Sequence, residues 1–429
     1  MEKYQIEKVQ ARQILDSRGN PTIEVEVLTY GGVCARAAVP SGKSKGRYEA
    51  IELRDGGKSF HGLSVFEAVR NVNDIIGPDL RGMDVRNQRE IDEMMITLDG
   101  TMDKSKLGAN SILGVSIASA KAVSEVEGIP LYRCLGGEEA TLLPIPFLNV
   151  INGGSHAGNK LDFQEHMVIP LGAESFFEAL KMGVEVYQEL KKILIKRYGR
   201  GAVNVGDEGG FAPNLSDTRE AMDDIIEAIE QAGFLEGTDF VLGIDAAASE
   251  FYKDNVYHID GKKLNEEELL QYYIDLIHDY PLNSIEDPFD EKAFRGFANL
   301  TAKANENIQI VCDDITVSNI KLLETAIEEK AGNALLLKVN QIGSLTEAIQ
   351  AAKMAFKNDF NVMVSHRSGE TEDTFIADLA VGLCSGQIKT GAPARSDRCA
   401  KYNQLLRIEE ILGMKGLYPK NFSSWKKFH

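Results

Sequence analysis

The chain has 429 residues, with a hydrophobic content of 43% and a charged content of 26%, which are ordinary values for a folded globular protein. This length exceeds one average domain and indicates two or three. The formal net charge of -18 disfavours nucleic acid or an anionic membrane as the main partner, because the overall field would repel both. An anionic small substrate stays compatible with this charge if divalent cations and a few lysines and arginines reverse its sign locally.

Targeting and redox signals are absent from the sequence. The N-terminus MEKYQIEKVQ lacks a basic and then apolar pattern, and no run of about 18 apolar residues occurs, so we expect a cytoplasmic protein. The five cysteines are scattered and form no C-x-x-C pair, which disfavours both zinc and disulfides.

Residues 1 to 138 predict a small α+β domain, with strands first and helices after them. Residues 6 to 15 and the alternating residues 22 to 28 indicate a hairpin, and residues 33 to 39 would add a third strand. The segment VPSGKSKGRYEA has no periodicity and predicts a loop. Three helices are then predicted, at residues 64 to 76, 87 to 98 and 110 to 127.

Residues 139 to 429 show a different pattern, in which apolar runs alternate with amphipathic helices. Successive strand–helix units indicate parallel strands, and this segment has the size of a (β/α)8 barrel. A doubly wound open sheet is the alternative, although no glycine-rich nucleotide-binding motif supports it. Six strands are predicted, at residues 240 to 244, 283 to 285, 308 to 312, 334 to 337, 362 to 365 and 387 to 388.

An ionisable residue follows each of the six predicted strands. In such a barrel, catalytic residues gather where strands end and the following loops begin. Any one of these residues has a plain explanation as a capping or surface group, but six in consecutive units favour a common site. They are Asp245, Glu286, Asp313, Lys338, His366 and Lys389.

Asp245, Glu286 and Asp313 form an oxygen-only set on adjacent strands, which suits Mg²⁺ better than zinc. A shift of one residue at the strand end would exchange Asp313 for Asp314, so both stay open.

Lys338 ends a buried strand, where a charge is costly unless it reaches solvent or has a chemical role. A second ammonium group at Lys389 and a nearby dication would lower its pKa, which would let Lys338 act as a general base. A base beside a hard metal ion suits removal of a proton from the carbon next to a carboxylate.

Two glycine-rich segments precede the repeats. GDEGGFAPN carries Asp207 and Glu208, and NGGSHAGNKLDFQEHM carries His156 and Glu165. The first is equally well explained as a loop with two solvated acids. The second is a weak signal by itself, because a lone loop histidine is usually solvated.

Taken together, these segments resemble the enolase family, the phosphopyruvate hydratases of glycolysis, over nearly the whole chain. The stretches that carry the resemblance are DSRGNPTIEVEV, LGANSILGVSIASAKA, NGGSHAGNK, GDEGGFAPN, LLLKVNQIGS, SHRSGETEDTFIADL and IKTGAPARS. The resemblance implies a lyase that reversibly dehydrates 2-phosphoglycerate, a phosphorylated carboxylate, to phosphoenolpyruvate. It also implies a homodimer or an assembly of dimers.

The resemblance further implies a role for each matching residue. Lys338 would take the C2 proton, and Glu208 would protonate the departing hydroxyl with help from Glu165. Asp245, Glu286 and Asp313 would hold the first Mg²⁺, and Ser41 would help to hold a second one with the substrate phosphate. The implied substrate contacts are His156, Glu165, His366, Arg367, Ser368, Lys389 and Ser41.

The sequence departs from the family pattern in its first loop, where Lys43 and Lys45 stand in place of the usual alanine and threonine. These cations would tighten phosphate binding or hinder loop closure, or would be solvated on a mobile loop. Two alternatives to enolase activity remain: a related enzyme acting on another carboxylate, and a retired enzyme kept as a structural or interaction protein. Loss of a metal ligand or of the base would favour the latter, and neither is missing.

Overall fold

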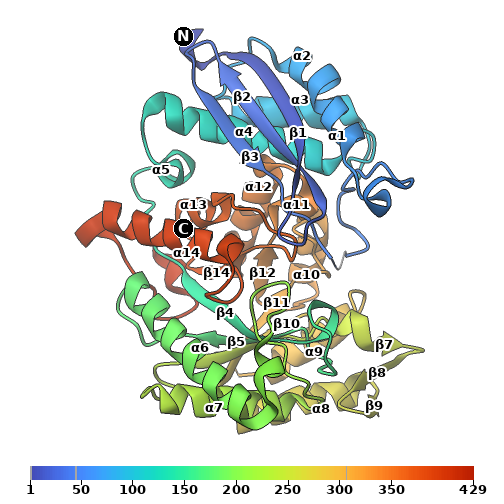
Figure 1. Ribbon diagram of the computed structural model, residues 1–429, viewed down its shortest axis with the longest axis vertical. Coiled ribbons are helices and arrows are strands. Elements are labelled where there is room, and N and C mark those ends of the chain that lie inside the picture. The colour runs from blue at the N-terminus through green and yellow to red at the C-terminus, as the bar shows by residue number, and fades with distance from the viewer. Residues whose placement is uncertain (1, 44–45, 306) are drawn as a thin grey trace.

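The N-terminal part of the chain folds around a three-stranded antiparallel sheet in a computed structural model, which describes residues 2–43, 46–305 and 307–429. The strands are β1 (Ile6–Leu15), β2 (Pro21–Thr29) and β3 (Cys34–Ala38), so the three predicted strands are confirmed. Helices α3 (Gln88–Asp99), α4 (Ala109–Glu127) and α5 (Leu131–Gly136) follow, and α4 packs on β2 and β3 (Figure 1). Alternating apolar residues of β2 are buried against this helix.

The predicted helix at residues 64 to 76 differs in the structure. It consists of α1 (Phe66–Arg70), a π-helical segment η3 (Asn71–Ile76) and α2 (Gly77–Leu80). A π-turn inserts one residue into the helical repeat, which an average periodicity of 3.6 residues does not reveal.

The rest of the chain forms a closed eight-stranded barrel, so the open-sheet alternative is wrong. All six predicted strands are present. In spatial order the barrel strands are β10 (Leu282–Glu286), β11 (Gln309–Cys312), β12 (Ala334–Leu337), β13 (Asn361–Ser365), β14 (Gln387–Lys389), β4 (Ile145–Asn152), β5 (Glu165–Ile169) and β6 (Val241–Asp245).

The barrel is not entirely parallel. Strand β5 runs antiparallel to both of its neighbours, β4 and β6, whereas the other barrel pairs are parallel. The connection from β4 to β5 contains no crossover helix, and a chain that returns directly pairs antiparallel.

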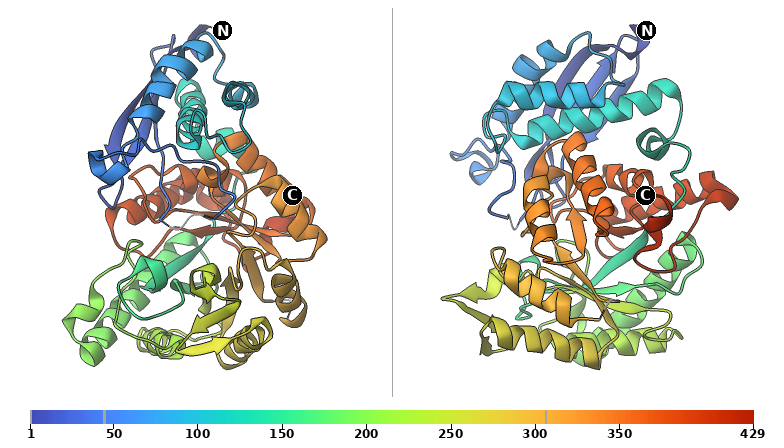
Figure 2. Two further views of the ribbon diagram at one scale, coloured as in Figure 1. Left: turned by 90° about the vertical axis from the view of Figure 1, so that its right-hand side faces the viewer. Right: turned by 180° about the vertical axis from the view of Figure 1, so that it is seen from behind.

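Helices cover the outside of the barrel (Figure 2). Ser175, Asp217, Asn265 and Ser344 each cap a helix by accepting a backbone N–H near its start. A small sheet of β7 (Tyr252–Lys253), β8 (Val256–Ile259) and β9 (Lys262–Leu264) was not predicted. The α-helices of this part of the chain are α6 (Phe176–Tyr198), α7 (Thr218–Gln231), α8 (Glu266–Asp279), α9 (Phe294–Lys303), α10 (Ile320–Glu328), α11 (Val339–Ile342), α12 (Leu345–Lys357), α13 (Phe375–Gly382) and α14 (Ser396–Leu412).

The segment after β3 reaches the carboxyl end of the barrel. Ser41 and Gly369 exchange two backbone hydrogen bonds of 2.7 and 2.9 Å, which join the N-terminal part to the loop after β13. The boundary between residues 138 and 139 stays a prediction. Within the described residues, no helix combines the length and apolar character needed to cross a membrane.

Candidate active site

The six predicted strand-end residues lie at one end of the barrel. Asp245, Glu286 and Lys389 are the last residues of β6, β10 and β14, and the other three directly follow their strands. A small cavity of about 20 Å³ opens there, which holds little more than one water molecule. Its lining consists of Lys43, His156, Gln164, Glu165, Glu208, Asp245, Lys338, Ser365, His366, Arg367, Ser368 and Lys389.

The ammonium group of Lys389 lies among three carboxylate side chains. Its Nζ lies 3.0 Å from Asp245 Oδ2, 2.9 Å from Glu286 Oε1 and 3.1 Å from Glu165 Oε1. Asp245 is the register partner of both neighbouring acids, because Glu286 and Glu165 oppose it on adjacent strands. Burial opposes the ammonium form of Lys389, but the three carboxylates outweigh burial and raise its pKa well above the usual value.

Lys338 donates a hydrogen bond from Nζ to Oδ2 of Asp313. Burial and the positive groups of Arg367 and Lys389 disfavour its charged form, but the contact with Asp313 outweighs them and raises the pKa of Lys338. The expected lowering of this pKa assumed a dication beside Lys338, so it stays a prediction. In this structure the predicted base and a predicted metal ligand are direct partners.

The choice between Asp313 and Asp314 is clarified by their hydrogen bonds. Asp313 faces Lys338 and also accepts a hydrogen bond of 2.9 Å from Nε2 of Gln341. Asp287 accepts backbone N–H groups of both Asp313 and Asp314 at 2.9 Å, so its carboxylate fixes the end of β11. Asp287, Asp313 and Asp314 bring possible ligand atoms within 4.8 Å of one another, but the Asp287 oxygens are already engaged.

The predicted ligand set fits a hard cation in its chemistry. Asp245, Glu286 and Asp313 are buried carboxylates that accept hydrogen bonds from nitrogen donors, chiefly the two ammonium groups. Buried carboxylates at this density need positive charge to remain ionised, and oxygen-only ligands are those that Mg²⁺ prefers.

A second acidic group contains His156, Glu165 and Glu208, whose possible ligand atoms all lie within 4.8 Å of one another. Nδ1 of His156 is 3.8 Å from Glu165 Oε1 and 3.4 Å from Glu208 Oε1. Burial and then the charge of Glu208 raise the pKa of Glu165 well above its usual range. Burial acts in the same direction on Glu208, but His156 and His366 outweigh it and lower the pKa of that carboxyl.

The opposite directions of these shifts favour proton binding by Glu165 over Glu208. The two buried acids are coupled, so they titrate as a unit. Nδ2 of Asn149 further favours the ionised form of Glu208 by donating a hydrogen bond of 3.0 Å to Oε2.

His366 lies between Glu208 and Arg398. Its Nε2 is 3.4 Å from Glu208 Oε1, and its Nδ1 is 2.5 Å from Nη1 of Arg398. Burial lowers the pKa of His366 to about 3, so its ring is neutral at neutral pH.

Three predicted contact residues have protein partners in this structure. Oγ of Ser41 donates to Asp16 at 2.8 Å and accepts from Nη2 of Arg18 at 2.9 Å. The guanidinium of Arg367 pairs with Glu49 at 3.0 Å. Oγ of Ser368 accepts a hydrogen bond of 3.4 Å from Nη1 of Arg18. Ser368 lines the cavity, whereas Ser41 is buried outside it. The roles of Ser41, Arg367 and Ser368 therefore stay predictions.

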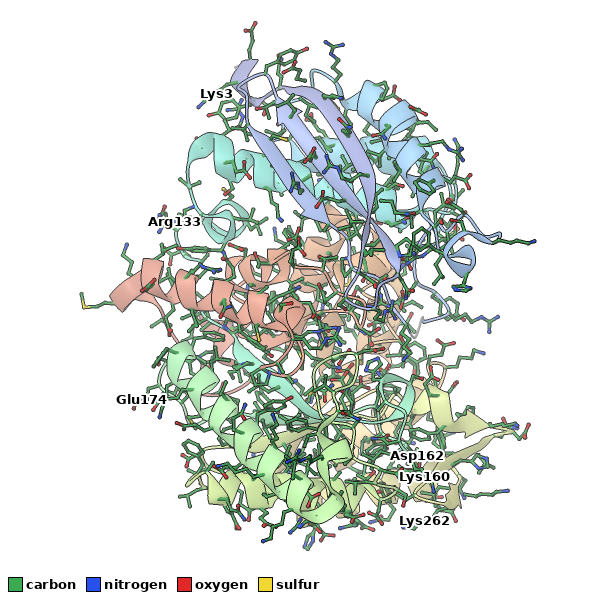
Figure 3. The ribbon with its side chains drawn as sticks, viewed as in Figure 1. Lys3, Arg133, Lys160, Asp162, Glu174 and Lys262 are labelled. Carbon is green, nitrogen blue, oxygen red and sulfur yellow. The ribbon has the colours of Figure 1, made fainter. Side chains whose placement is uncertain are left out.

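Lys43 lines the cavity mouth, where its Nζ lies 3.0 Å from Oδ2 of Asp207. This pair joins the loop after β3 to the segment that carries Glu208. Lys45, the second unusual cation, lies outside the described residues. Asp162, labelled in Figure 3, accepts a backbone N–H from Asp260 beside the small sheet and does not line the cavity.

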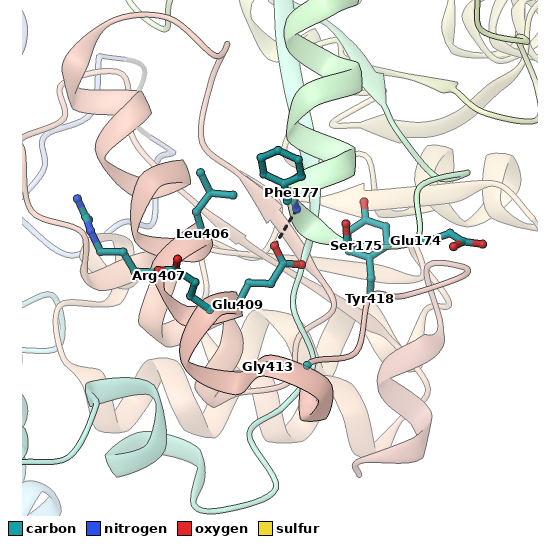
Figure 4. Close-up of a pocket in the computed structure, with 10 residues that line it drawn as sticks. Glu174, Ser175, Phe177, Leu406, Arg407, Glu409, Gly413 and Tyr418 are labelled. Carbon is teal, nitrogen blue, oxygen red and sulfur yellow. Dashed lines mark hydrogen bonds between the residues drawn. The ribbon is translucent and has the colours of Figure 1, made fainter.

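A larger hollow of about 600 Å³ lies between α6 and α14 (Figure 4). Glu409 occupies its wall, where the carboxylate accepts N–H groups of Phe176 and Phe177 at 2.7 and 2.9 Å. This acid stabilises the start of α6. The hollow lies apart from the ionisable cluster, and size alone does not make it the reaction site.

Comparison with known proteins decides the family. The family model described as the enolase N-terminal domain matches residues 6–135, and the model of the enolase C-terminal TIM barrel domain matches residues 140–426. The chain belongs to the enolase family. It is 57% identical to an enolase of Methanocaldococcus jannaschii, over 98% of this chain and 99% of the relative. It is also 58% identical to an enolase of Methanosarcina acetivorans, over 96% of this chain and 95% of the relative.

Sequence reasoning missed several polar residues of the site. Asn149 and Gln164 lie on or beside β4 and β5, two strands that were not predicted. Gln341 and Glu49 hold Asp313 and Arg367, and Arg398 lies within α14. The sequence shows an unusual run of charged residues early in α14. That run alone does not indicate that Arg398 is fully buried.

Proposed function

We propose that this chain is a phosphopyruvate hydratase, a lyase that reversibly dehydrates 2-phosphoglycerate to phosphoenolpyruvate in glycolysis. The observation that carries the proposal is the meeting of Lys338 and the buried pair Glu165 and Glu208 on one cavity of an enolase-family barrel. A base and an acid on one cavity are what removal of a proton and of a hydroxyl from adjacent carbons requires. Relatives that are 57% identical over nearly the full length carry the name enolase.

In this proposal Lys338 removes the C2 proton, and Glu208 delivers a proton to the departing hydroxyl. Glu165 assists by storing the proton, since its pKa is raised and its carboxylate lies in the same cluster as that of Glu208. Lys338 must first lose its own proton, which the contact with Asp313 opposes. Weakening of that contact is therefore part of the activation of the base.

Asp245, Glu286 and Asp313 are the residues that would hold the first Mg²⁺, and Ser41 would contribute to a second site. When bound, Mg²⁺ supplies positive charge for the oxygens on which negative charge develops. The support for this assignment is the oxygen-only chemistry of the three buried acids. Ser41 would first have to leave Asp16 and Arg18.

The remaining predicted contacts are proposed to orient the substrate. Arg367 and Ser368 would bind the substrate phosphate, and Lys389 would bind the substrate carboxylate. His156 and His366 would contact the remaining polar groups of the substrate. All five of these residues line the cavity. A volume of about 20 Å³ leaves no room for a phosphorylated carboxylate, so side chains must move when it enters.

We also propose a homodimer or assembly of dimers in the cytoplasm, with domains at residues 1–138 and 139–429. Family membership supports these points. The two earlier alternatives, another carboxylate substrate and a retired enzyme, are not favoured, because every proposed acid, base and metal ligand is present.

The proposal is tested by mixing the purified chain with 2-phosphoglycerate and saturating Mg²⁺ and following the ultraviolet absorbance of phosphoenolpyruvate. We expect turnover that stops with a chelator and returns with Mg²⁺. No turnover of this substrate under these conditions would overturn the proposal. Turnover of other 3-hydroxy acids, with or without a phosphate at C2, should be slower.

A further inference from the structure

Arg398 is a fully buried arginine on α14 that belongs to none of the predicted site residues. Its Nη1 donates to the carbonyl oxygen of Arg367 at 2.7 Å and approaches Nδ1 of His366 at 2.5 Å. Its Nη2 donates to the carbonyl oxygens of Asp207 and Ser368 at 3.1 and 2.8 Å. One side chain thus joins the residue before Glu208 to the loop after β13.

The charge of Arg398 is balanced close by. Its Nε lies 2.8 Å from Oδ2 of Asp397, and both residues belong to the first turn of α14. A buried guanidinium is costly unless its charge and its N–H groups are satisfied. Three backbone carbonyls accept hydrogen bonds from its two terminal nitrogens, Asp397 balances its charge, and Nη1 also faces the His366 ring.

The contact with His366 has a specific chemical consequence. A guanidinium carries only donors and does not lose its proton in proteins. The ring nitrogen that faces it must therefore be an acceptor, which makes Nδ1 the unprotonated nitrogen of neutral His366. The proton then lies on Nε2, which faces Oε1 of Glu208 at 3.4 Å.

We propose that Arg398 is a positioning residue that fixes the Nε2–H tautomer of His366 and so presents a hydrogen-bond donor to Glu208. The inference deepens the proposed function, on which its catalytic meaning rests. With the opposite tautomer, an Nε2 lone pair would face the carboxylate of Glu208. Glu208 would then need a proton of its own, and the division of protons between Glu165 and Glu208 would change.

The same contacts also position two segments of the proposed site, the one that carries Glu208 and the one that carries Arg367 and Ser368. Asp207 precedes Glu208 directly, and Arg367 and Ser368 follow His366, so loss of the guanidinium releases three backbone carbonyls at once. Groups of this kind that orient a functional histidine typically change activity by about 10- to 100-fold when they are removed.

The decisive experiment is ¹⁵N NMR of histidine-labelled protein, because protonated and unprotonated ring nitrogens have well separated shifts. The chain has 7 histidines, and His366→Asn identifies the signal of interest. We expect a neutral ring with the proton on Nε2 in the intact protein. A proton on Nδ1, or a charged ring at neutral pH, would overturn the proposal without any reference to turnover.

Arg398→Met removes the donors while keeping a side chain of similar length. We expect a mixture of His366 tautomers and turnover reduced by about 10- to 100-fold, with partial recovery when guanidinium is added and none with methylammonium. A folded variant that keeps pure Nε2–H would contradict the proposal. The matched control is Arg395→Met, because Arg395 also pairs with Asp397 but contacts Ser17 rather than His366. In this control the tautomer of His366 should be unchanged.

If Arg398→Met does not fold, the wild-type tautomer still decides the matter. The proposed function fails in a different way, through absence of 2-phosphoglycerate turnover in the intact chain. The two failures are therefore distinguishable.

Discussion

The ammonium group of Lys338 donates a hydrogen bond to Oδ2 of Asp313, so the proposed base and a proposed metal ligand neutralise each other in this structure. The contact joins the ends of neighbouring strands β12 and β11. It raises the pKa of Lys338 against the effect of burial. In the proposed mechanism, catalysis then depends on changing the electrostatics of Asp313.

Replacement of Lys338 by alanine should reduce turnover of 2-phosphoglycerate by at least about 10²- to 10⁴-fold, the usual contribution of a general base. The measurement is kcat for phosphoenolpyruvate formation, with circular dichroism as the check on folding. Lys353→Ala, at an exposed position of α12, is the matched control and should retain full turnover. Equal losses in the two variants would remove Lys338 from the mechanism.

Replacement of Asp245 by asparagine should raise the Mg²⁺ concentration that gives half-maximal turnover by tenfold or more, on the order of the effect of losing one charged ligand. The physical reason is that an amide oxygen carries no net charge and binds a hard cation more weakly. Titration of activity with Mg²⁺ after chelator treatment gives the value. An unchanged Mg²⁺ requirement would show that Asp245 is no ligand.

Lys43 is expected to help attract the anionic substrate, because it is a partly exposed cation at the mouth of the cavity. Lys43→Ala should raise KM by about two- to fivefold at low salt and leave kcat nearly unchanged, since exposed charge interactions are worth about 1 kcal/mol or less. The difference should shrink as ionic strength rises. Lys58→Ala, an exposed change further along the chain, should leave KM unaltered.

Asp378 provides a test of stability away from the cavity. Its oxygens accept hydrogen bonds from Tyr132 N and Gln404 Nε2, which lower its pKa, but burial outweighs them and raises it from 3.8 to about 6. The folded state therefore holds this proton more tightly than the unfolded state. The free energy of unfolding should fall by up to roughly 3 kcal/mol as pH rises from about 4 to 6.

Asp378→Asn should remove that loss and raise the urea midpoint at pH 7 relative to the wild type, with a smaller difference at pH 4. Asp359→Asn changes an exposed acid paired with Lys426 and serves as the control. A variant that is equally destabilised at both pH values would show that hydrogen bonding, and not proton binding, dominates at this site.

The barrel strands that the sequence predicts most clearly are those that consist of an uninterrupted apolar run with polar residues on either side. Residues 334 to 337 are an example, since all four are apolar and buried. Strand β5 was missed because Glu165 and His166 interrupt its apolar pattern, although both side chains are buried. The polar residues of the site therefore remove the apolar pattern by which the strand that carries them could be predicted.

The site itself was predictable in its strand-end residues because the topology of a barrel brings such positions together. The partners of each charge were not, because pairing depends on positions in space. Arg398 illustrates this limit: it is one of several charged residues early in α14, and only packing against the loop after β13 distinguishes it.

Hydrogen exchange at C2 of 2-phosphoglycerate in deuterated water tests the central claim most directly. NMR should show loss of the C2 proton signal with the wild-type chain and Mg²⁺, and no exchange with Lys338→Ala. Exchange by Lys338→Ala at the wild-type rate would show that another group removes the proton and would contradict the proposed role of Lys338.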